Sequence, residues 1–325
     1  MIITKAPLRM SFIGGGTDLS SFYEHHTGSV ISTSINKYVY ITVHERFESN
    51  MRLAYSDIEI ANSVSAIKHP LIKNVCLALG IDENLEISSI ADIPSNGTGL
   101  GSSSSFTVAL IEALAGYKGQ RLTKDAIADL ACKVEIELCG QPIGKQDQYA
   151  ASFGGLRRYD FHQDGTVTSK LLSQNPDFID YLEKNILVLF TGKTRSASSI
   201  LSKQSKIKPG DNKFDFFVEM VKLVDPFEHA LRDEDLEKLG LILNEGWQMK
   251  KNLVEGISDN EIDLAYQTAI ANGAIGGKLL GAGAGGFLMF IAPLSSHNSI
   301  IEAIPQYRYI PIRFDKSGVN KIFGE

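Results

Sequence analysis

Cysteine is scarce in this sequence of 325 residues. The three cysteines are Cys76, Cys132 and Cys139, and their odd number and wide spacing argue against a disulfide framework or a zinc site. We therefore expect thiols in a reducing compartment. The N-terminus lacks the apolar core of a signal peptide, and no apolar run approaches the length of a membrane span. Together these absences predict a cytoplasmic protein.

An excess of positive charge is also missing. Lysine and arginine number 32 against 38 aspartates and glutamates, which gives a formal net charge of −6. Such a mildly acidic chain does not indicate binding to nucleic acid or to an anionic membrane. A phosphorylated ligand would therefore need a local pocket. The hydrophobic content of 43% is ordinary for a globular protein, and the length favours two domains.

Strand and helix patterns follow one another irregularly along the chain. We expect strands at 29–47, 84–92, 185–193 and 307–314, and helices at 105–117, 123–140, 215–224, 234–254 and 258–273. Ser258 and Glu261 form the pattern of a capping box at the start of the last helix. The regular alternation of a doubly wound sheet is missing, so the sequence predicts an α+β fold. We expect two closely packed domains, 1–175 and 176–325.

The stretch PSNGTGLGSSSSF, residues 94–106, places three glycines and four consecutive serines between an expected strand and an expected helix. Glycines let the backbone approach a ligand, and the N–H groups and dipole at a helix N-terminus favour an anion. The alternative is a flexible turn in which Ser102 to Ser105 only cap the helix, but a cap needs one serine and no dense glycine. We therefore predict a phosphate-binding loop, whose serines can also reach magnesium.

This loop is not a Walker A motif, because it has no lysine after its glycines. Residues 140–146, GQPIGKQ, have the wrong gap, and residues 191–194, TGKT, lack the upstream glycine. Another glycine-rich segment, GGKLLGAGAGGF at 276–287, precedes a strand where a dinucleotide fingerprint would open a helix. It is either a tight turn packed against backbone or a loop that approaches a triphosphate from the other domain, and we favour the second interpretation.

Acidic residues supply further candidates. Asp147 is expected in a polar turn after a helix, where an aspartate is most often only a turn former. Glu135 and Glu137 fall on opposite edges of the apolar stripe of the 123–140 helix. At most one of these two glutamates can therefore face an interior site.

Four segments taken in order, KAPLRMSFIGGGTD, PSNGTGLGSSSSF, GQPIGKQDQ and GGKLLGAGAGGF, resemble the GHMP kinases. This family includes galactokinase, homoserine kinase, mevalonate kinase and phosphomevalonate kinase. The segments span residues 5–287, nearly the whole chain. The resemblance implies a two-domain α+β fold with ATP between the domains. The N-terminal domain would be ribosomal protein S5 domain 2-like, with an unusual left-handed βαβ unit, and the C-terminal domain would be ferredoxin-like.

Within the family, PLRMSFIGGGTD together with GKQDQYAASFGGL is most similar to bacterial kinases of D-glycero-D-manno-heptose 7-phosphate. This resemblance implies magnesium- and ATP-dependent phosphorylation of the anomeric hydroxyl to give the 1,7-bisphosphate, for nucleotide-activated heptose and surface polysaccharide. A kinase of a galactose- or fucose-type sugar and a catalytically silent sensor of sugar or nucleotide are the alternatives. Galactokinases typically carry a Glu-His pair where this chain reads GGGTD. A nicotinamide-dependent dehydrogenase would rest only on GAGAGG in the wrong context.

The resemblance also implies roles for individual residues. Asp147 would lie near the acceptor hydroxyl, accompanied by Arg9, and Asp18 would bind sugar hydroxyls. The residues implied to bind the substrate are Gly15, Gly16, Thr17 and Asp18. Those implied to surround the nucleotide are Gly97, Thr98, Gly99, Leu100, Gly101, Ser102, Ser103, Ser104 and Ser105, with Gly283. Those implied to bind magnesium are Ser103 and Glu135, with Glu137 as the alternative.

A sugar phosphate needs a second anion site. Lys193 and Arg195 lie on a loop after an expected strand and are our first candidates for this site. Arg157 and Arg158 are a further pair, although basic residues in loops are most often only solvated.

Overall fold

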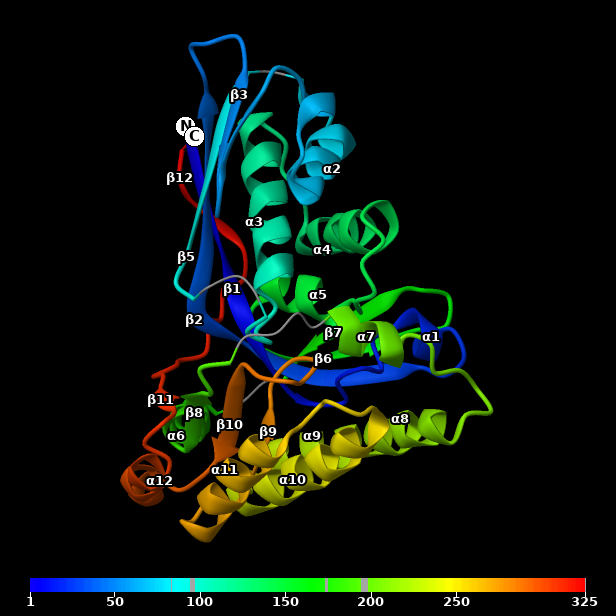
Figure 1. The fold of residues 1–325 in the computed structure, drawn as a ribbon, viewed down its shortest axis with the longest axis vertical. Helices are drawn as coiled ribbons and strands as arrows, with labels where there is room; N and C mark the ends of the chain where they lie inside the picture. Colours follow the sequence, from blue (N-terminus) through cyan, green and yellow to red (C-terminus); the bar gives the residue numbers. More distant parts are fainter. Residues whose placement is uncertain (83, 94–96, 173–174, 194–197, 325) are drawn as a thin grey trace.

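The computed structural model describes residues 1–325 except 83, 94–96, 173–174, 194–197 and 325, and two sheets organise the described chain (Figure 1). The first sheet has the order β12-β1-β2-β5-β3-β4, and β6 and β7 extend it from β2. Its strands are β1 (Ile2–Ile13), β2 (Gly28–Glu45), β3 (Met51–Ala54), β4 (Ile58–Ala61), β5 (Leu85–Ala91), β6 (Leu156–Phe161), β7 (Val167–Leu171) and β12 (Asn320–Phe323).

The second sheet is antiparallel, with the order β11-β8-β10-β9. Its strands are β8 (Ile186–Phe190), β9 (Gly276–Leu279), β10 (Phe287–Ile291) and β11 (Arg308–Tyr309). The helices are α1 (Ser20–Tyr23), α2 (Pro70–Leu79), α3 (Ser102–Tyr117), α4 (Lys124–Cys132), the π-helical turn η2 (Lys133–Leu138), α5 (Gln146–Phe153), α6 (Pro176–Lys184), α7 (Ser198–Gln204), α8 (Asn212–Lys222), α9 (Val224–Arg232), α10 (Leu236–Leu253), α11 (Asn260–Ala271) and α12 (His297–Ala303), with short 3-10 turns at Val64–Ala66 and Leu294–Ser296. This mixture confirms the α+β class.

The long strand β2 connects the two arms of the first sheet. It pairs with β6 through residues 28–33 and with β5 through residues 39–45, while β1 follows it along both stretches. The register of β1 against β2 shifts between Pro7 and Leu8. Proline has no N–H to donate to the ladder, which explains an irregularity at this position. The second half of β1, after this shift, carries Arg9 and Ser11 of the site described below.

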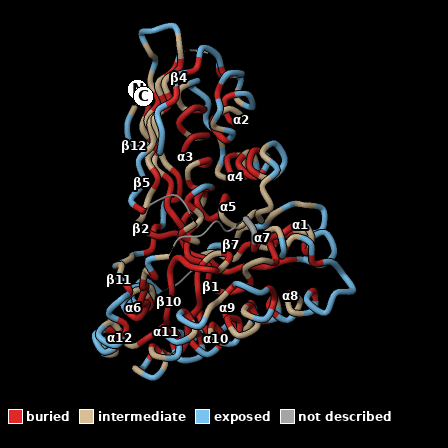
Figure 2. Tube along the Cα trace, in the orientation of Figure 1, coloured by how far each residue is buried: buried red, intermediate tan, exposed pale blue. Residues whose placement is uncertain are grey.

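Helix α3 forms the core of the upper part of the molecule, where it packs against β1 and β2. It is buried on nearly every side, as Figure 2 shows, because its sequence is apolar around most of its circumference. In the lower part, α10 covers the second sheet through β9 and β10, and α9 packs on α10. Both helices also contact the first sheet, α10 against β1 and α9 against β2. The two parts are therefore closely packed, and residues placed on β1 can meet residues placed on α10.

Several expectations are wrong in detail. The strand expected at 307–314 is only the two-residue β11, because Pro311 cannot donate to β8 beyond Ile310. The cap of α11 is Asp259, which accepts from the N–H of Ile262 at 2.9 Å, whereas the Ser258 hydroxyl donates to Asp263. A carboxylate satisfies a helix N-terminus better than a hydroxyl, because it also interacts with the dipole.

The serines of the glycine-rich loop do not cap α3. Gly101 occupies the N-cap position, and Ser102 begins the helix. Asp147 is not in a simple turn but in the first turn of α5.

Strand β12 returns to pair with β1, so residues near both ends of the sequence share one sheet. The division into 1–175 and 176–325 stays a prediction. None of the three cysteines, all within the described chain, forms a disulfide. No described helix combines the length and the apolar character needed to cross a bilayer.

Candidate active site

A cavity of about 530 Å³ lies between the part of the molecule that is built on β1 and α3 and the part that contains α10 and β9. One wall comes from the second half of β1, the loop that follows it, the glycine-rich loop with the start of α3, and residues 141–147. The opposite wall comes from α7, α10, β9 and the turn after β9. The predicted residues that line it are Arg9, Gly15, Gly16, Asp18, Gly97, Thr98, Gly99, Gly101, Ser102, Ser103, Ser104 and Asp147.

The glycine-rich loop needs glycine for two separate reasons. Gly97, Gly99 and Gly101 all have positive φ, between 68° and 77°, which other residues rarely adopt. A Cβ on Gly99 would stand 2.5 Å from the carbonyl oxygen of Leu280, and one on Gly101 would stand 3.0 Å from the Asp147 carboxylate. The loop is thus pressed between the other wall of the cavity and the site carboxylate.

Two predicted loop residues hold the loop and do not line the cavity. The carbonyl of Leu100 accepts from the N–H of Arg9 at 3.0 Å, and the Ser105 hydroxyl donates to the carbonyl of Pro7 at 2.7 Å. Both residues are buried. They fasten the start of α3 to β1, which fixes the loop relative to Arg9.

Arg9 and Asp147 form a two-pronged ion pair at the centre of the site. Arg9 Nε and one terminal nitrogen each lie 2.7 Å from an oxygen of Asp147, and the other terminal nitrogen donates to the carbonyl of Gly99 at 2.6 Å. The side chain of Arg9 is 5% exposed and that of Asp147 is 23% exposed. A planar guanidinium held at three points orients the carboxylate strongly, so one rigid unit joins β1, α5 and the loop.

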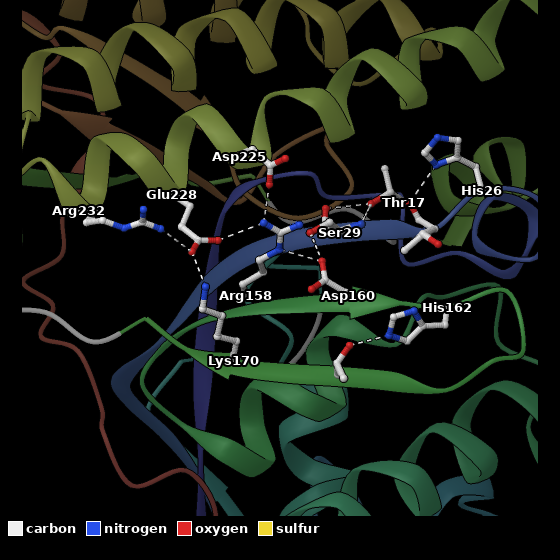
Figure 3. Close-up of polar contacts among 12 residues, drawn as sticks. Thr17, His26, Ser29, Arg158, Asp160, His162, Lys170, Asp225, Glu228 and Arg232 are labelled. Carbon is white, nitrogen blue, oxygen red and sulfur yellow. Dashed lines mark hydrogen bonds and ion pairs between the residues drawn. The ribbon is translucent and has the colours of Figure 1, made fainter.

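Asp18 lies next to this pair, at the end of the GGGTD segment. Its two oxygens accept from the N–H groups of Gly16 and Gln146 at 3.0 and 3.2 Å. Burial raises the pKa of Asp18, and the neighbouring Asp147 carboxylate raises it further. Thr17, in contrast, turns away from the cavity, and its hydroxyl donates to the carbonyls of Gly14 and Ser29 (Figure 3). Thr17 therefore shapes the loop on which Asp18 is carried.

Glu135 lies behind the glycine-rich loop and is fully buried. Its oxygens accept from the Ser103 hydroxyl at 3.0 Å and from the Gln148 amide at 2.6 Å, while Glu137 is exposed to solvent. Burial raises the pKa of Glu135 despite these hydrogen bonds. Glu135 belongs to the π-helical turn η2, a widened geometry often found at functional sites. It is Glu135, then, that the structure brings to Ser103.

This oxygen pair suits magnesium, which prefers hard oxygen ligands and commonly uses one carboxylate together with substrate phosphates. The described residues contain no cluster of three or more metal-ligating side chains. An ion here would therefore depend on ligands from a bound nucleotide. The residues fit such a shared ion.

Of the basic residues predicted for a second anion site, those that the structure describes, Lys193, Arg157 and Arg158, do not line the cavity. Lys193 forms ion pairs with Asp259 at 3.0 Å and Glu261 at 2.6 Å. Arg195 lies outside the described residues. Figure 3 shows Arg158 between Asp160 on β6 and the α9 residues Asp225 and Glu228. The neighbouring Arg157 donates to the carbonyl of Gly154 and the hydroxyl of Ser169.

The segment at 276–287 packs against the glycine-rich loop. A Cβ on Gly281 would stand 2.3 Å from the Cα of Gly99, and one on Gly286 would stand 2.3 Å from the carbonyl oxygen of Thr98. Gly283 lies against Ile257 and is not in the cavity wall. This part of the segment supports the loop through backbone contact.

Sequence reasoning missed two lysines and a serine of the cavity wall. Lys250 on α10 and Lys278 on β9 are 6% and 5% exposed, and Ser11 on β1 is 4% exposed. Burial lowers the pKa of Lys250 to about 8, with Arg9 lowering it further and Asp18 opposing, and burial lowers the pKa of Lys278 strongly. The sequence could have indicated that Lys250 is buried, because Lys250 lies four residues after Gly246 and therefore on the same buried face of α10.

Comparison with known proteins gives a consistent picture. Residues 64–155 match the family described as GHMP kinases N terminal domain, and residues 227–310 match GHMP kinases C terminal. The chain is 32% identical to the D-glycero-alpha-D-manno-heptose 7-phosphate kinase of Campylobacter jejuni, over 98% of each sequence. It is 28% identical to the galactokinase of Pyrococcus furiosus, over 93% of this chain and 92% of the other.

Among solved structures, a D-glycero-D-manno-heptose 1-phosphate kinase from Bacteroides thetaiotaomicron superimposes with a TM-score of 0.83. The two sequences are 25% identical, and the match covers all of both chains.

Proposed function

This chain belongs to the GHMP kinase family and is an ATP-dependent sugar kinase, and we propose that its acceptor is D-glycero-D-manno-heptose 7-phosphate. The proposed product is the 1,7-bisphosphate, formed at the anomeric hydroxyl. The single observation that carries the proposed site is the Arg9–Asp147 ion pair held against Gly99 and Gly101 of the loop. It joins a carboxylate, a cation and a phosphate-binding backbone within one cavity.

In this proposal, the backbone and hydroxyls of Gly97 to Ser104 bind the nucleotide phosphates. Ser103 and Glu135 would hold a magnesium ion, which when bound neutralises the triphosphate and the charge that develops during transfer. The donor triphosphate therefore lies at the start of α3, where backbone N–H groups and the helix dipole favour negative charge. Leu100 and Ser105 keep this loop in place from behind.

Asp18, Gly15 and Gly16 are proposed to bind the sugar, with the Asp18 carboxylate accepting from its hydroxyls. The acceptor oxygen attacks the terminal phosphorus, the bond to the leaving diphosphate oxygen breaks, and the hydroxyl proton passes to Asp147. Arg9 stabilises the negative charge on the transferring group while it holds Asp147 in position. Phosphoryl transfer depends mainly on such positioning and charge stabilisation.

An ADP-release assay across sugars tests the acceptor. The proposal expects turnover with heptose 7-phosphate and little with heptose 1-phosphate, galactose or fucose, and an NMR spectrum of the product locates the new phosphate. The 1-phosphate is included because the Bacteroides relative is named for it. Turnover confined to galactose or fucose would remove the heptose proposal and leave a sugar kinase.

Asp147→Asn tests the catalytic carboxylate. Because a general base contributes roughly 100- to 10,000-fold, we expect kcat to fall by that factor with ATP affinity unchanged. Asp125→Asn is the matched control, since Asp125 is also a first-turn aspartate but is exposed and lies outside the cavity wall. Full activity in Asp147→Asn would exclude this residue from the reaction.

A further inference from the structure

The wall of the cavity opposite the glycine-rich loop carries two buried ammonium groups that the proposed transfer step does not use. Lys250 Nζ donates to the carbonyl of Gly281, and Lys278 Nζ donates to the carbonyl of Phe12 at 2.9 Å. Within the described chain, neither lysine has a carboxylate oxygen within 4 Å. Buried charges are normally paired with an opposite charge, and an ammonium has three hydrogens to donate. Each lysine therefore has unused donors and an uncompensated charge in a cavity.

Both lysines lie near the segment that is proposed to bind the sugar, and Lys250 also reaches Gly281, which packs against the glycine-rich loop. The Phe12 carbonyl that binds Lys278 comes two residues before the loop at 14–18 that carries Asp18. Lys250 is one helical turn beyond Gly246, whose Cα packs against Ile13: a Cβ on Gly246 would stand 2.6 Å from the end of that side chain. Both lysines are thus gathered around the end of β1.

A third group in the same wall points to a ligand. The Ser11 hydroxyl is buried and lines the cavity, and it has no hydrogen-bond partner. It directly precedes Phe12, the partner of Lys278. A buried hydroxyl without a partner is costly, so a polar group that enters the cavity best explains its presence in this wall.

We propose that Lys250, Lys278 and Ser11 form the site for the phosphate group that the acceptor sugar already carries. The inference rests on the proposed function, because it requires a phosphorylated acceptor. Two ammonium groups match the charge of a phosphate dianion, and the hydroxyl adds a neutral donor. Arg9 has another role in the proposed function, because its nitrogens hold Asp147 and the Gly99 carbonyl and its charge faces the transferring group. The site gives the kinase a means to distinguish a sugar phosphate from a free sugar.

The test compares Lys250→Met and Lys278→Met with wild type in steady-state kinetics, using heptose 7-phosphate and unphosphorylated heptose as acceptors. Lys251→Met is the matched control, because the neighbouring Lys251 pairs with Asp263 and does not line the cavity. A hydrogen bond to a charged group contributes about 1.5 to 3 kcal/mol, so each site variant should raise the KM for the sugar phosphate roughly 10- to 100-fold. The KM for ATP and the rate with the free sugar should change less than about threefold.

Two results would overturn the inference. An equal fall in kcat with both acceptors and an unchanged KM would place the lysines on the transferring phosphoryl group. A raised KM for ATP would place them on the triphosphate.

If wild type does not turn over heptose 7-phosphate, the proposed acceptor fails, but the anion site can still be tested. The experiment is a calorimetric titration with inorganic phosphate in the presence of saturating magnesium and a non-hydrolysable ATP analogue. Because the analogue occupies the nucleotide loop, the added phosphate can bind only at other sites. Binding that is lost in Lys250→Met and Lys278→Met, and retained in Lys251→Met, supports the site. Equal binding in all four proteins excludes it.

Discussion

The buried charge of Lys250 should destabilise the ligand-free enzyme, and this penalty can be measured. The pKa of Lys250 falls from 10.5 to about 8, and burial is the largest cause. Each pH unit between the two values corresponds to about 1.4 kcal/mol, so the protonated side chain costs the native state about 3 kcal/mol. Lys250→Met removes that cost but leaves the Gly281 carbonyl without its partner, which costs about 1 to 2 kcal/mol. We expect a net gain of about 1 to 2 kcal/mol.

The pH dependence gives the sign of this effect. Below pH 8 both the native and the unfolded wild type carry the proton, and the native state has the full penalty. Between pH 8 and 10.5 the native state releases its proton while the unfolded state keeps it, so wild type gains stability as the pH rises. The advantage of Lys250→Met should therefore be full at pH 7, vanish near pH 10 and become a deficit of about 1 kcal/mol above pH 10.5, where the lost hydrogen bond to Gly281 is the main remaining effect. The charged groups facing Lys250 are Arg9, Asp18 and Lys278.

Urea unfolding followed by circular dichroism measures both proteins at pH 7 and pH 10. The buffer must contain no phosphate, because an anion bound between the lysines would stabilise wild type by mass action. A stability loss in Lys250→Met that is equal at the two pH values would refute the reasoning, since it would mean that the ammonium carries no burial penalty. The control Lys251→Met should show no pH-dependent gain.

Three further outcomes follow from other contacts. Gly101→Ala should lower kcat roughly 10- to 100-fold, because its Cβ meets the Asp147 carboxylate, whereas Gly119→Ala has the same backbone strain in open space and should keep full activity. Glu135→Gln should raise the magnesium concentration for half-maximal rate about tenfold and leave the sugar KM unchanged, with exposed Glu137→Gln as its control. Arg158→Met should lower the free energy of unfolding by about 1 to 3 kcal/mol, because it removes the ion pairs with Asp160 and Glu228. The control Lys222→Met breaks an exposed pair with Glu219 and should have almost no effect. An unchanged unfolding midpoint for Arg158→Met would contradict this account.

Local chemistry explains which parts of the site could be predicted. The glycine-rich loop was visible because its conformation requires glycine at 97, 99 and 101, and because a helix follows it. The family resemblance singled out Arg9 and Asp147, but no spacing in the sequence shows that they form an ion pair, since they are 138 residues apart. Their contact depends on the packing of α5 against β1.

The lysines were missed for a different reason. An apolar stripe is found by its apolar members, and Lys250 interrupts that of α10 with a charge. Lys278 lies within the glycine-rich segment at 276–287, and the function of this segment was inferred from its glycines alone. In the same way, residues Tyr307 to Phe314 have the composition of a strand, but only Arg308 and Tyr309 pair with β8. The position of β8 and the missing N–H of Pro311 limit the length of this pairing. Burial and strand partners are tertiary properties, and local patterns do not contain them.

The pairing of β12 with β1 has a consequence for synthesis. Strand β1 is synthesised long before the neighbour on its outer edge, Asn320–Phe323, because all the other described strands and helices lie between them in the sequence. Until then the backbone groups along that edge are open to other strands, which is the condition that favours misassembly. Contacts between such distant segments are also slow to form. We therefore expect an emerging chain to need protection of this edge, and a chain shortened before residue 320 to be prone to aggregation even though its catalytic cavity is complete.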